Sequence, residues 1–260
     1  MTTTLLVTLV GCFIAQKLLE GWKTEPWVLE HLALSTEGLR RGWVYQLISF
    51  QFLHEGIFHL LGNMIGLYFF GRSMEAMLGS RGMLKLYLAS GTVGGLLQMA
   101  LGFAFPEHFG RQVVGASAGV FGLIAAFATQ APDDPITLLL FFFFPITFPA
   151  KVLLIVEGGI SLLGVIGPLI HMPFEEGVAH AAHLGGMLTG IAWIRVMMSP
   201  TPRFQFWKTM SRRPTPKREP AVTPAKRSPR AARKKSDELP AGEFISREVD
   251  PILEKISAQG

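Results

Sequence analysis

Three uncharged polar residues of the kinds used in nucleophilic catalysis lie inside apolar stretches of the chain. Ser117 lies in the run Gly-Ala-Ser-Ala-Gly, His183 in Ala-His-Ala-Ala-His-Leu-Gly-Gly, and Asn63 in a third stretch. Each lies about 14 or 15 residues from the polar end of its own stretch, or about 21–23 Å along a helix at about 1.5 Å per residue. Polar groups at that depth of a bilayer core of about 30 Å are costly unless they face one another or a water-filled cavity.

The pairing of a serine with a histidine predicts nucleophilic catalysis. A serine hydroxyl becomes reactive when a base takes its proton, and a neutral imidazole such as that of His183 can be this base. Attack on an amide carbonyl creates an oxyanion, for which His59 and Asn63, four residues apart on one helix face, can supply N–H donors together with the backbone N–H of Ser117. No acidic residue lies within the outer halves of these stretches to orient His183, so we predict a Ser–His dyad held by stacking and packing.

Composition predicts that these residues belong to a multi-pass membrane protein. Hydrophobic residues make up 49% of the chain and charged residues 17%. The first 199 residues contain six apolar stretches, most of which approach the roughly 20 residues that span a bilayer: 3–19, 57–78, 82–104, 115–131, 150–170 and 177–198. The first lacks a basic start and a cleavage site, so we expect a retained helix. It contains the only cysteine, Cys12, which excludes an intrachain disulfide.

The remaining residues differ in composition and indicate the orientation. Residues 200–260 carry 14 Lys and Arg against 7 Asp and Glu, and 12 of these 14 lie between Arg203 and Lys235. Such an excess marks the cytoplasmic side, so the C-terminus is expected inside, and with six helices the N-terminus as well. Ser117, His183 and Asn63 would then converge toward the exterior.

The composition of this tail also predicts its behaviour. Residues 200–243 are rich in Pro, Arg and Lys, and we expect a disordered segment that binds anionic lipids of the inner leaflet. Nucleic-acid binding is the weaker alternative, and no nucleic-acid partner is expected. Residues 244–260 have the helical spacing of a short amphipathic helix.

The fourth apolar stretch is too short for an ordinary span, because Ser117 to Ala131 covers only about 22 Å of helix. Its helix is expected to begin at the serine, preceded by non-helical backbone at 112–116 that is buried in protein or lines a wet cavity. Small-xxx-small pairs are expected to bring helix backbones close together: Gly91 and Gly95, Gly115 and Gly119, and Gly186 and Gly190. Gly186 and Gly190 share a helix face with His183.

Taken together, these motifs resemble the rhomboid family of intramembrane serine proteases over residues 43–198. The resemblance rests on His-x-x-x-Asn at 59–63, Gly-x-Ser-x at 115–118 and Ala-His-x-x-His-x-x-Gly at 179–186, in that order. Residues 45–49 resemble the family's outer-loop element, in which Trp-Arg-Leu is common, with Tyr45 and Gln46 in place of Trp and Arg. The fold implied is an all-α membrane protein with a six-transmembrane-helix rhomboid core at 1–199.

The resemblance implies roles for individual residues. Ser117 is the nucleophile, His183 the base, and His59 and Asn63 line the oxyanion hole. Structural support is expected from five further residues: Gly115, His54, His180, Gly186 and Glu75. The implied activity is hydrolysis of peptide bonds in or near transmembrane segments of single-pass proteins, with no cofactor or metal. The C-terminal segment resembles an element of some bacterial relatives, which favours a bacterial inner membrane.

Several alternatives stay open at this point. Ser117 could bond a carbonyl of its own helix, and His180 with His183 could bind a metal, although nothing completes a site. Glu157, inside the fifth stretch, is expected to be protonated and bonded to a neighbouring helix. The loop at 170–178 is a candidate lid. The rival functions are a catalytically inactive rhomboid-like protein that binds membrane clients, and a small multi-pass transporter.

Overall fold

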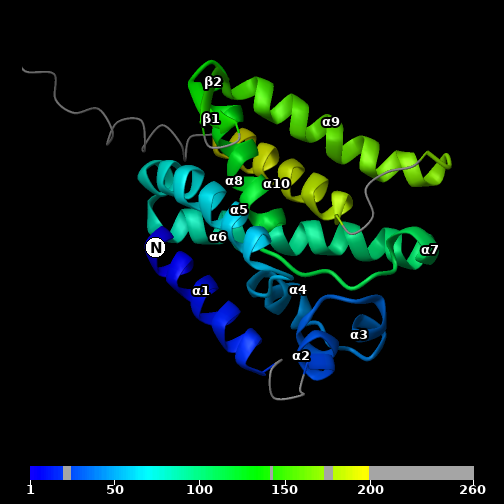
Figure 1. Ribbon diagram of the computed structural model, residues 1–260. Helices are drawn as coiled ribbons and strands as arrows, with labels where there is room; N and C mark the ends of the chain where they lie inside the picture. Colours follow the sequence, from blue (N-terminus) through cyan, green and yellow to red (C-terminus); the bar gives the residue numbers. More distant parts are fainter. Residues whose placement is uncertain (20–24, 141–142, 173–177, 199–260) are drawn as a thin grey trace, which may run out of the picture. The chain divides into compact units, whose positions relative to one another are not determined.

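The structure is a computed structural model that describes residues 1–19, 25–140, 143–172 and 178–198, which are mainly helical (Figure 1). The predicted tail segments 200–243 and 244–260, and residues 173–177 of the predicted lid, lie outside the described residues. The elements in chain order are α1 (Thr2–Leu19), α2 (Glu25–Leu32), α3 (Thr36–Arg40), α4 (Gln46–Ser49), η2 (Phe50–Phe52), α5 (Ile57–Gly66), η3 (Leu67–Gly71), α6 (Arg72–Ala104), α7 (Pro106–Phe109), α8 (Ser117–Gln130), β1 (Pro135–Leu140), β2 (Phe144–Pro149), α9 (Ala150–Leu169) and α10 (His180–Met198).

The length and hydropathy of several helices indicate a membrane protein. Within the described ranges, three helical segments are long and apolar enough to cross a bilayer: Thr2–Leu19, Ile57–Ala104 and Ala150–Leu169. The second has 48 residues, about 72 Å at 1.5 Å per residue, which is more than twice a bilayer core. It is broken at Gly79, whose φ of 72° and ψ of 166° are not helical. The break falls where the sequence predicts one apolar stretch to end and the next to begin.

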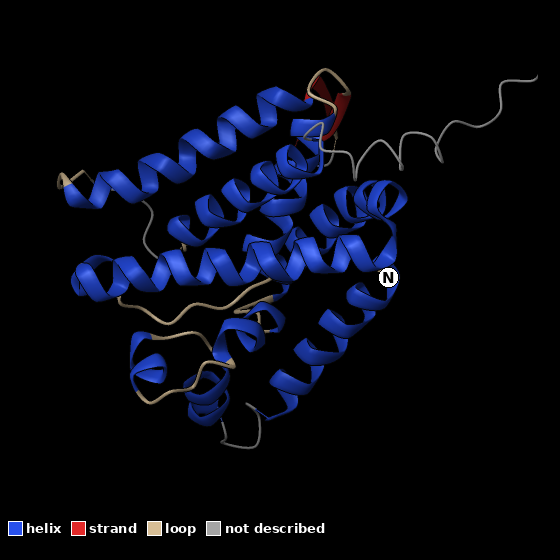
Figure 2. Cartoon of the chain, turned by 180° about the vertical axis from the view of Figure 1, so that it is seen from behind, coloured by secondary structure: helices blue, strands red, loops and turns tan. Residues whose placement is uncertain are grey.

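The centre of the fold consists of α6, α8 and α10, whose backbones approach closely at glycines. A Cβ placed on Gly186 would collide with the carbonyl of Ala118, and one on Gly190 with the carbonyl of Gly122. The predicted Gly186 and Gly190 pair therefore does pack α10 against α8. α1 contacts α5 and α6, and α9 contacts α8 and α10, so the two helices flank this centre on opposite sides (Figure 2).

Gly91 and Gly95 lie against side chains and not against the backbone of a neighbouring helix. A Cβ on Gly91 would collide with the side chain of Gln51, and one on Gly95 would approach Leu34 and Phe50, all in the segment before α5. The glycine of α6 that meets α10 is Gly94, which lies against the Ala182 carbonyl and Gly185. The GxxxG spacing identifies a close approach but cannot say which neighbour makes it.

A short β-hairpin departs from the predicted all-α fold. β1 pairs antiparallel with β2 in the register Pro135 with Pro149 through Leu140 with Phe144. The Thr137 and Thr147 hydroxyls are 2.8 Å apart across this pair. Threonine and aromatic residues favour strands, but an aromatic run before an apolar stretch equally fits an anchor at the membrane interface, so the sequence did not predict the hairpin. Residues 141–142 lie outside the described residues.

The segment between α1 and α5 is anchored by Gln46, which is fully buried. Its Oε1 accepts a hydrogen bond from the backbone N–H of Ser35 at 3.2 Å. Its Nε2 donates to the backbone carbonyls of Glu30 at 3.1 Å and His31 at 3.0 Å. One amide side chain thus joins α4 to α2 and to the start of α3.

We expect Gln46→Leu to lower the free energy of unfolding by about 2–4 kcal/mol, since each buried group left without a partner costs about 1–3 kcal/mol. Gln130→Leu is the matched control, because Gln130 is exposed at the end of α8. Thermal unfolding of the purified protein in detergent measures both. Equal midpoints for the two variants would contradict the anchoring role of Gln46.

Candidate active site

Ser117 begins α8, and the backbone before it is not helical, as the short fourth stretch predicts. Val113 pairs with Leu34 through two backbone hydrogen bonds of 2.8 and 3.0 Å, and the Gly115 N–H donates to the Phe50 carbonyl at 2.9 Å. Gly115 has a φ of +126°, a left-handed conformation that favours glycine. The extended backbone therefore keeps its hydrogen bonds while it delivers Ser117 to the first position of the helix.

Ser117 and His183 are in direct contact. The His183 Nε2 and the Ser117 Oγ are 2.7 Å apart, although the two residues are 66 positions apart in the chain. With the imidazole neutral and its proton on Nδ1, the serine hydroxyl donates to Nε2. The glycine contacts between α8 and α10 bring the two helices close enough for this short bond. Ser117 thus uses its hydroxyl to reach the neighbouring helix.

An aromatic ring holds the imidazole. The Phe121 and His183 ring centroids are 4.4 Å apart with an interplanar angle of 32°. His180 meets the same imidazole edge-on at 6.2 Å and packs against Gly164 of α9. In the described ranges no carboxylate is hydrogen-bonded to His183. Stacking and packing therefore fix the ring, which is the arrangement expected when no triad acid is present.

The two candidate oxyanion donors lie near Ser117. A Cβ on Gly115 would fall 2.7 Å from the His59 Nε2 and 3.7 Å from the Ser117 Oγ, so the imidazole of His59 lies directly against this glycine. The Asn63 Nδ2 donates to the His59 carbonyl of its own helix at 3.0 Å. The amide group of asparagine has two N–H donors, so one of them stays available for a further partner.

His54 supports this region through both its backbone and its ring. The His54 backbone N–H donates to the Gln16 Oε1 at 3.1 Å, and the Gln16 Nε2 donates to the His54 carbonyl at 3.0 Å. These two bonds tie α1 to the segment before α5. Its ring meets His59 edge-on with centroids 5.1 Å apart. Burial, followed by the nearby His59, lowers the pKa of His54 to about 4. The ring is therefore neutral at physiological pH and adds no charge beside His59.

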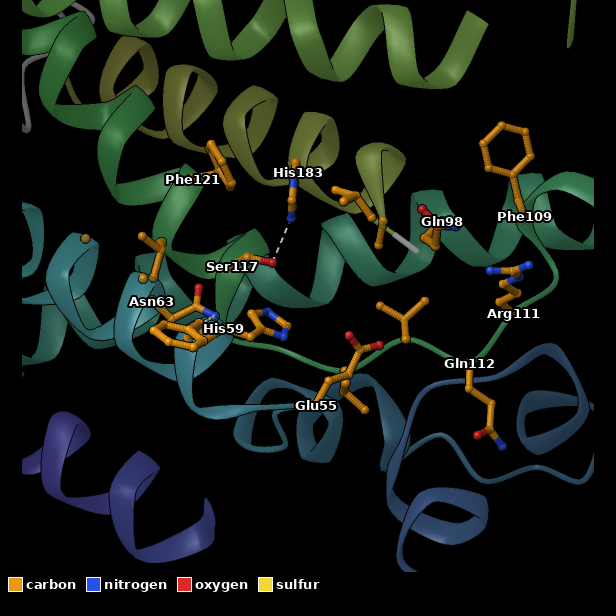
Figure 3. Close-up of a pocket in the computed structure, with 18 of the residues that line it drawn as sticks. Glu55, His59, Asn63, Gln98, Phe109, Arg111, Gln112, Ser117, Phe121 and His183 are labelled. Atoms are coloured by element: carbon orange, nitrogen blue, oxygen red, sulfur yellow. Dashed lines mark hydrogen bonds between the residues drawn. The ribbon is translucent and has the colours of Figure 1, made fainter. Parts of the chain in front are cut away.

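These residues line one cavity of about 540 Å³, which Figure 3 shows in close-up. Ser117, His183, His59 and Asn63 all face it. The other lining residues are Glu55, Phe58, Gly62, Gly66, Gln98, His108, Phe109, Arg111, Gln112, Val113, Val114, Val120, Phe121, Ile124, Val178 and Ala179. The cavity has room for several residues of an extended peptide next to the Ser–His pair.

Glu75, predicted as structural support, and Glu157, a further functional candidate, do not line the cavity. Glu75 accepts hydrogen bonds from the Thr2 N–H at 2.8 Å, the Thr2 hydroxyl at 2.7 Å and the Ser80 hydroxyl at 2.5 Å, and so ties α1 to α6 away from the cavity. Glu157 lies on the face of α9 that carries Leu153 and Ser161. Among the described residues it has no hydrogen-bond partner, so the predicted bond to a neighbouring helix is not found.

Several residues of the cavity were not predicted from the sequence. Phe121 follows Ser117 by one helical turn, and this spacing is the signal that could have identified it. The Gln98 Oε1 accepts a hydrogen bond from the Ala182 N–H at 3.3 Å beside His183. A single amide in the apolar stretch 82–104 was the available signal for Gln98. In the described part of the chain no three His, Cys, Asp or Glu side chains converge as metal ligands.

The chain is similar in sequence to a known family profile and to known proteins. The Rhomboid domain profile matches residues 41–200. The chain is 32% identical over 196 residues to RHOMBOID-like protein 12, mitochondrial, of Arabidopsis thaliana, which covers 70% of this chain and 54% of the relative. It is 29% identical over 164 residues to Presenilin-associated rhomboid-like protein A, mitochondrial, of Danio rerio, covering 60% and 39%. It is 31% identical over 151 residues to Rhomboid-related protein 1 of Caenorhabditis elegans, covering 58% and 39%.

The chain therefore spans about half or less of the length of these relatives. The matched region contains the Ser117 and His183 pair, the His59 and Asn63 face of α5 and the cavity between them. More than half of the chain falls inside the family domain. The chain belongs to the rhomboid family.

Proposed function

We propose that this protein is an intramembrane serine endopeptidase that hydrolyses peptide bonds in or near transmembrane segments of single-pass membrane proteins. The observation that carries the proposal is the 2.7 Å contact between the Ser117 Oγ and the His183 Nε2, in a cavity that also contains His59 and Asn63. A serine that bonded only its own helix would not make this contact. No cofactor is needed for the chemistry.

The reaction proceeds in two halves. The Ser117 Oγ attacks the carbonyl carbon of the substrate while the His183 Nε2 takes the hydroxyl proton, and the C–N bond breaks as His183 returns that proton to the leaving amine. A water molecule then gives a proton to His183 and attacks the acyl-enzyme. The acid product leaves as the proton returns to the Ser117 Oγ. One histidine therefore acts in turn as base and acid.

The oxyanion formed in both halves is stabilised by N–H donors. The proposed donors are His59, Asn63 and the backbone N–H of Ser117, because both side chains line the cavity that contains Ser117. Donors that are fixed before the reaction stabilise the developing charge without reorganisation, which is often the largest contribution to acyl transfer. Phe121 replaces the orienting acid of a triad by holding the imidazole face.

The proposed membrane arrangement has six spans. They are α1, the two halves of the long helical run at 57–78 and 80–104, α8, α9 and α10. The excess of Lys and Arg just after α10 places the C-terminus on the cytoplasmic side, and an even number of spans then places the N-terminus there too. Ser117, at the start of a short helix, lies toward the outer half of the bilayer.

The partners proposed are transmembrane substrates and, for the basic residues 203–235, anionic lipids of the inner leaflet. The relatives whose names give a compartment are mitochondrial. They therefore lend no support to the bacterial inner membrane expected from the C-terminal segment. The localisation that we propose is therefore a membrane, in which the protein is integral and multi-pass.

Substrate choice follows from the backbone of a transmembrane helix. Its carbonyls are engaged in intrahelical hydrogen bonds, so the helix must unwind before Ser117 can attack. A small residue such as alanine is expected before the cleaved bond, because a short side chain lets the peptide backbone approach the Ser117 Oγ closely. Gly and Pro near that bond lower the stability of the helix by about 1 and 3 kcal/mol respectively.

The test is cleavage of two single-pass substrates that differ only in the outer part of the helix. We expect a substrate with Gly-Pro there to be cut at least about tenfold faster than its poly-Leu counterpart, at a site that mass spectrometry maps near the outer end. Equal rates would contradict the unwinding requirement. Capture of both substrates without cleavage would contradict the protease and favour an inactive client-binding protein.

A further inference from the structure

The charged residues on the cavity wall are few and of opposite sign. Among the lining residues, Glu55 carries a carboxylate and Arg111 a guanidinium, and the rest are neutral or histidine. In Figure 3 the Glu55 carboxylate points into the cavity, whereas Arg111 lies at the end that contains Phe109 and Gln98. The two charges therefore mark different parts of the cavity.

In the described part of the chain, the Glu55 carboxylate accepts no hydrogen bond and forms no salt bridge. Other acids are used structurally there: Glu30 and Glu37 pair with Arg41, and Asp133 pairs with Lys151. Lys17 reaches Glu55, but its ammonium donates to the Glu55 backbone carbonyl at 3.4 Å. The carboxylate is therefore left to face the cavity.

Its position matters because the reaction develops negative charge nearby. Glu55 precedes α5, four residues before His59, and an electrostatic interaction connects the two. A carboxylate close to a forming oxyanion opposes catalysis, since like charges repel in a partly dry site. A positive charge brought in by the substrate would remove this penalty and would gain attraction as well.

We propose that Glu55 forms an acidic subsite that selects substrates with a lysine or arginine a few residues to the outer side of the cleaved bond. This inference rests on the proposed protease function and names the charge that the same cavity recognises. The outer side follows from the direction of the chain, because it runs from Glu55 past His59 to Asn63 on α5, which lies deeper in the proposed membrane arrangement. An extended peptide advances about 3.3 Å per residue, so a long basic side chain within a few positions can reach the carboxylate.

The experiment uses single-pass substrates that differ at one position, scanned over the six residues outside the mapped cleavage bond, with Lys, Gln or Glu. At the best position we expect kcat/KM to fall about threefold from Lys to Gln and about threefold again to Glu, the size of a solvent-accessible ion pair. The preference should weaken with added salt, because the pair is screened.

Variants of the protein then assign the preference to one side chain. Glu55→Gln is expected to remove it, and Glu55→Lys to reverse it in favour of Glu substrates. Glu107→Gln is the matched control, since Glu107 is also exposed but does not line the cavity, and it should keep the preference for Lys. A preference for Lys that persists in Glu55→Gln would overturn the proposal, as would the absence of any charge preference.

A binding measurement separates this proposal from the protease itself. The Ser117→Ala protein, which cannot form the acyl-enzyme, is titrated with the same Lys and Glu substrates, with and without Glu55→Gln. Tighter binding of the Lys substrate that depends on Glu55 supports the subsite even if no substrate is cleaved by the unmodified protein. Cleavage without any dependence of binding or rate on Glu55 would refute the subsite and leave the protease standing.

Discussion

Replacing Ser117 or His183 by alanine is expected to reduce cleavage of a transmembrane substrate by a factor on the order of 10⁶ in kcat, because nucleophile and base act as one unit. The contact between them is a single 2.7 Å hydrogen bond. His180 does not qualify as a substitute base, since its ring packs on Gly164 of α9 and meets His183 edge-on at 6.2 Å.

The double variant Ser117→Ala/His183→Ala tests whether the two residues act as one unit. If the two residues act together, the double variant should be no less active than either single variant. Ser73→Ala is the matched control, because Ser73 is exposed and bonds the Phe69 carbonyl within its own helix. The rates are compared with purified proteins of equal thermal stability. Losses that multiply in the double variant would indicate two independent effects.

Replacing an oxyanion donor is expected to have the second largest effect. We expect Asn63→Ala and His59→Ala each to lower kcat by about 10²–10³, with a much smaller change in KM, because the charge that these residues stabilise exists only in the transition state. Asn63 keeps one amide hydrogen bond to the His59 carbonyl at 3.0 Å, which orients its second N–H. His59 is positioned by Gly115 and by the neutral ring of His54.

Stability measurements distinguish this role from a structural one. Leu61→Ala serves as the control on α5, because Leu61 is exposed on the same helix. The thermal midpoint and kcat of each variant are measured on one preparation. A loss of kcat that only parallels the loss of stability, or full kcat in both oxyanion variants, would contradict the assignment of α5 to the oxyanion hole.

The features that the sequence predicted well depend on local pattern. Apolar stretches define helices within a few residues, so α8 was expected to begin at Ser117 and does. The contact between Ser117 and His183 was also predictable, because a serine and a histidine at one depth of an apolar fold are costly unless they meet. Gly186 and Gly190 were expected to allow close packing beside His183, and they do so against α8.

The features that the sequence did not predict depend on partners far along the chain. Gln46 holds α2 and α3 through backbone groups 11 to 16 residues away, and no spacing rule identifies a buried amide of this kind. Gly94 meets α10 while Gly91 and Gly95 meet the segment before α5, which only the arrangement of helices decides. The β1–β2 hairpin was missed because its short run of aromatic residues also fits a membrane-interface anchor.

The central claim is that His183 activates Ser117 as a nucleophile. It is tested most directly by treating the purified protein with a fluorophosphonate and locating the adduct by mass spectrometry of its peptides. The account predicts one phosphonylated serine, Ser117, and no adduct there in His183→Ala, while Ser73 stays unmodified in both. Absence of an adduct on Ser117, or labelling of Ser117 at the same rate in His183→Ala, would contradict it.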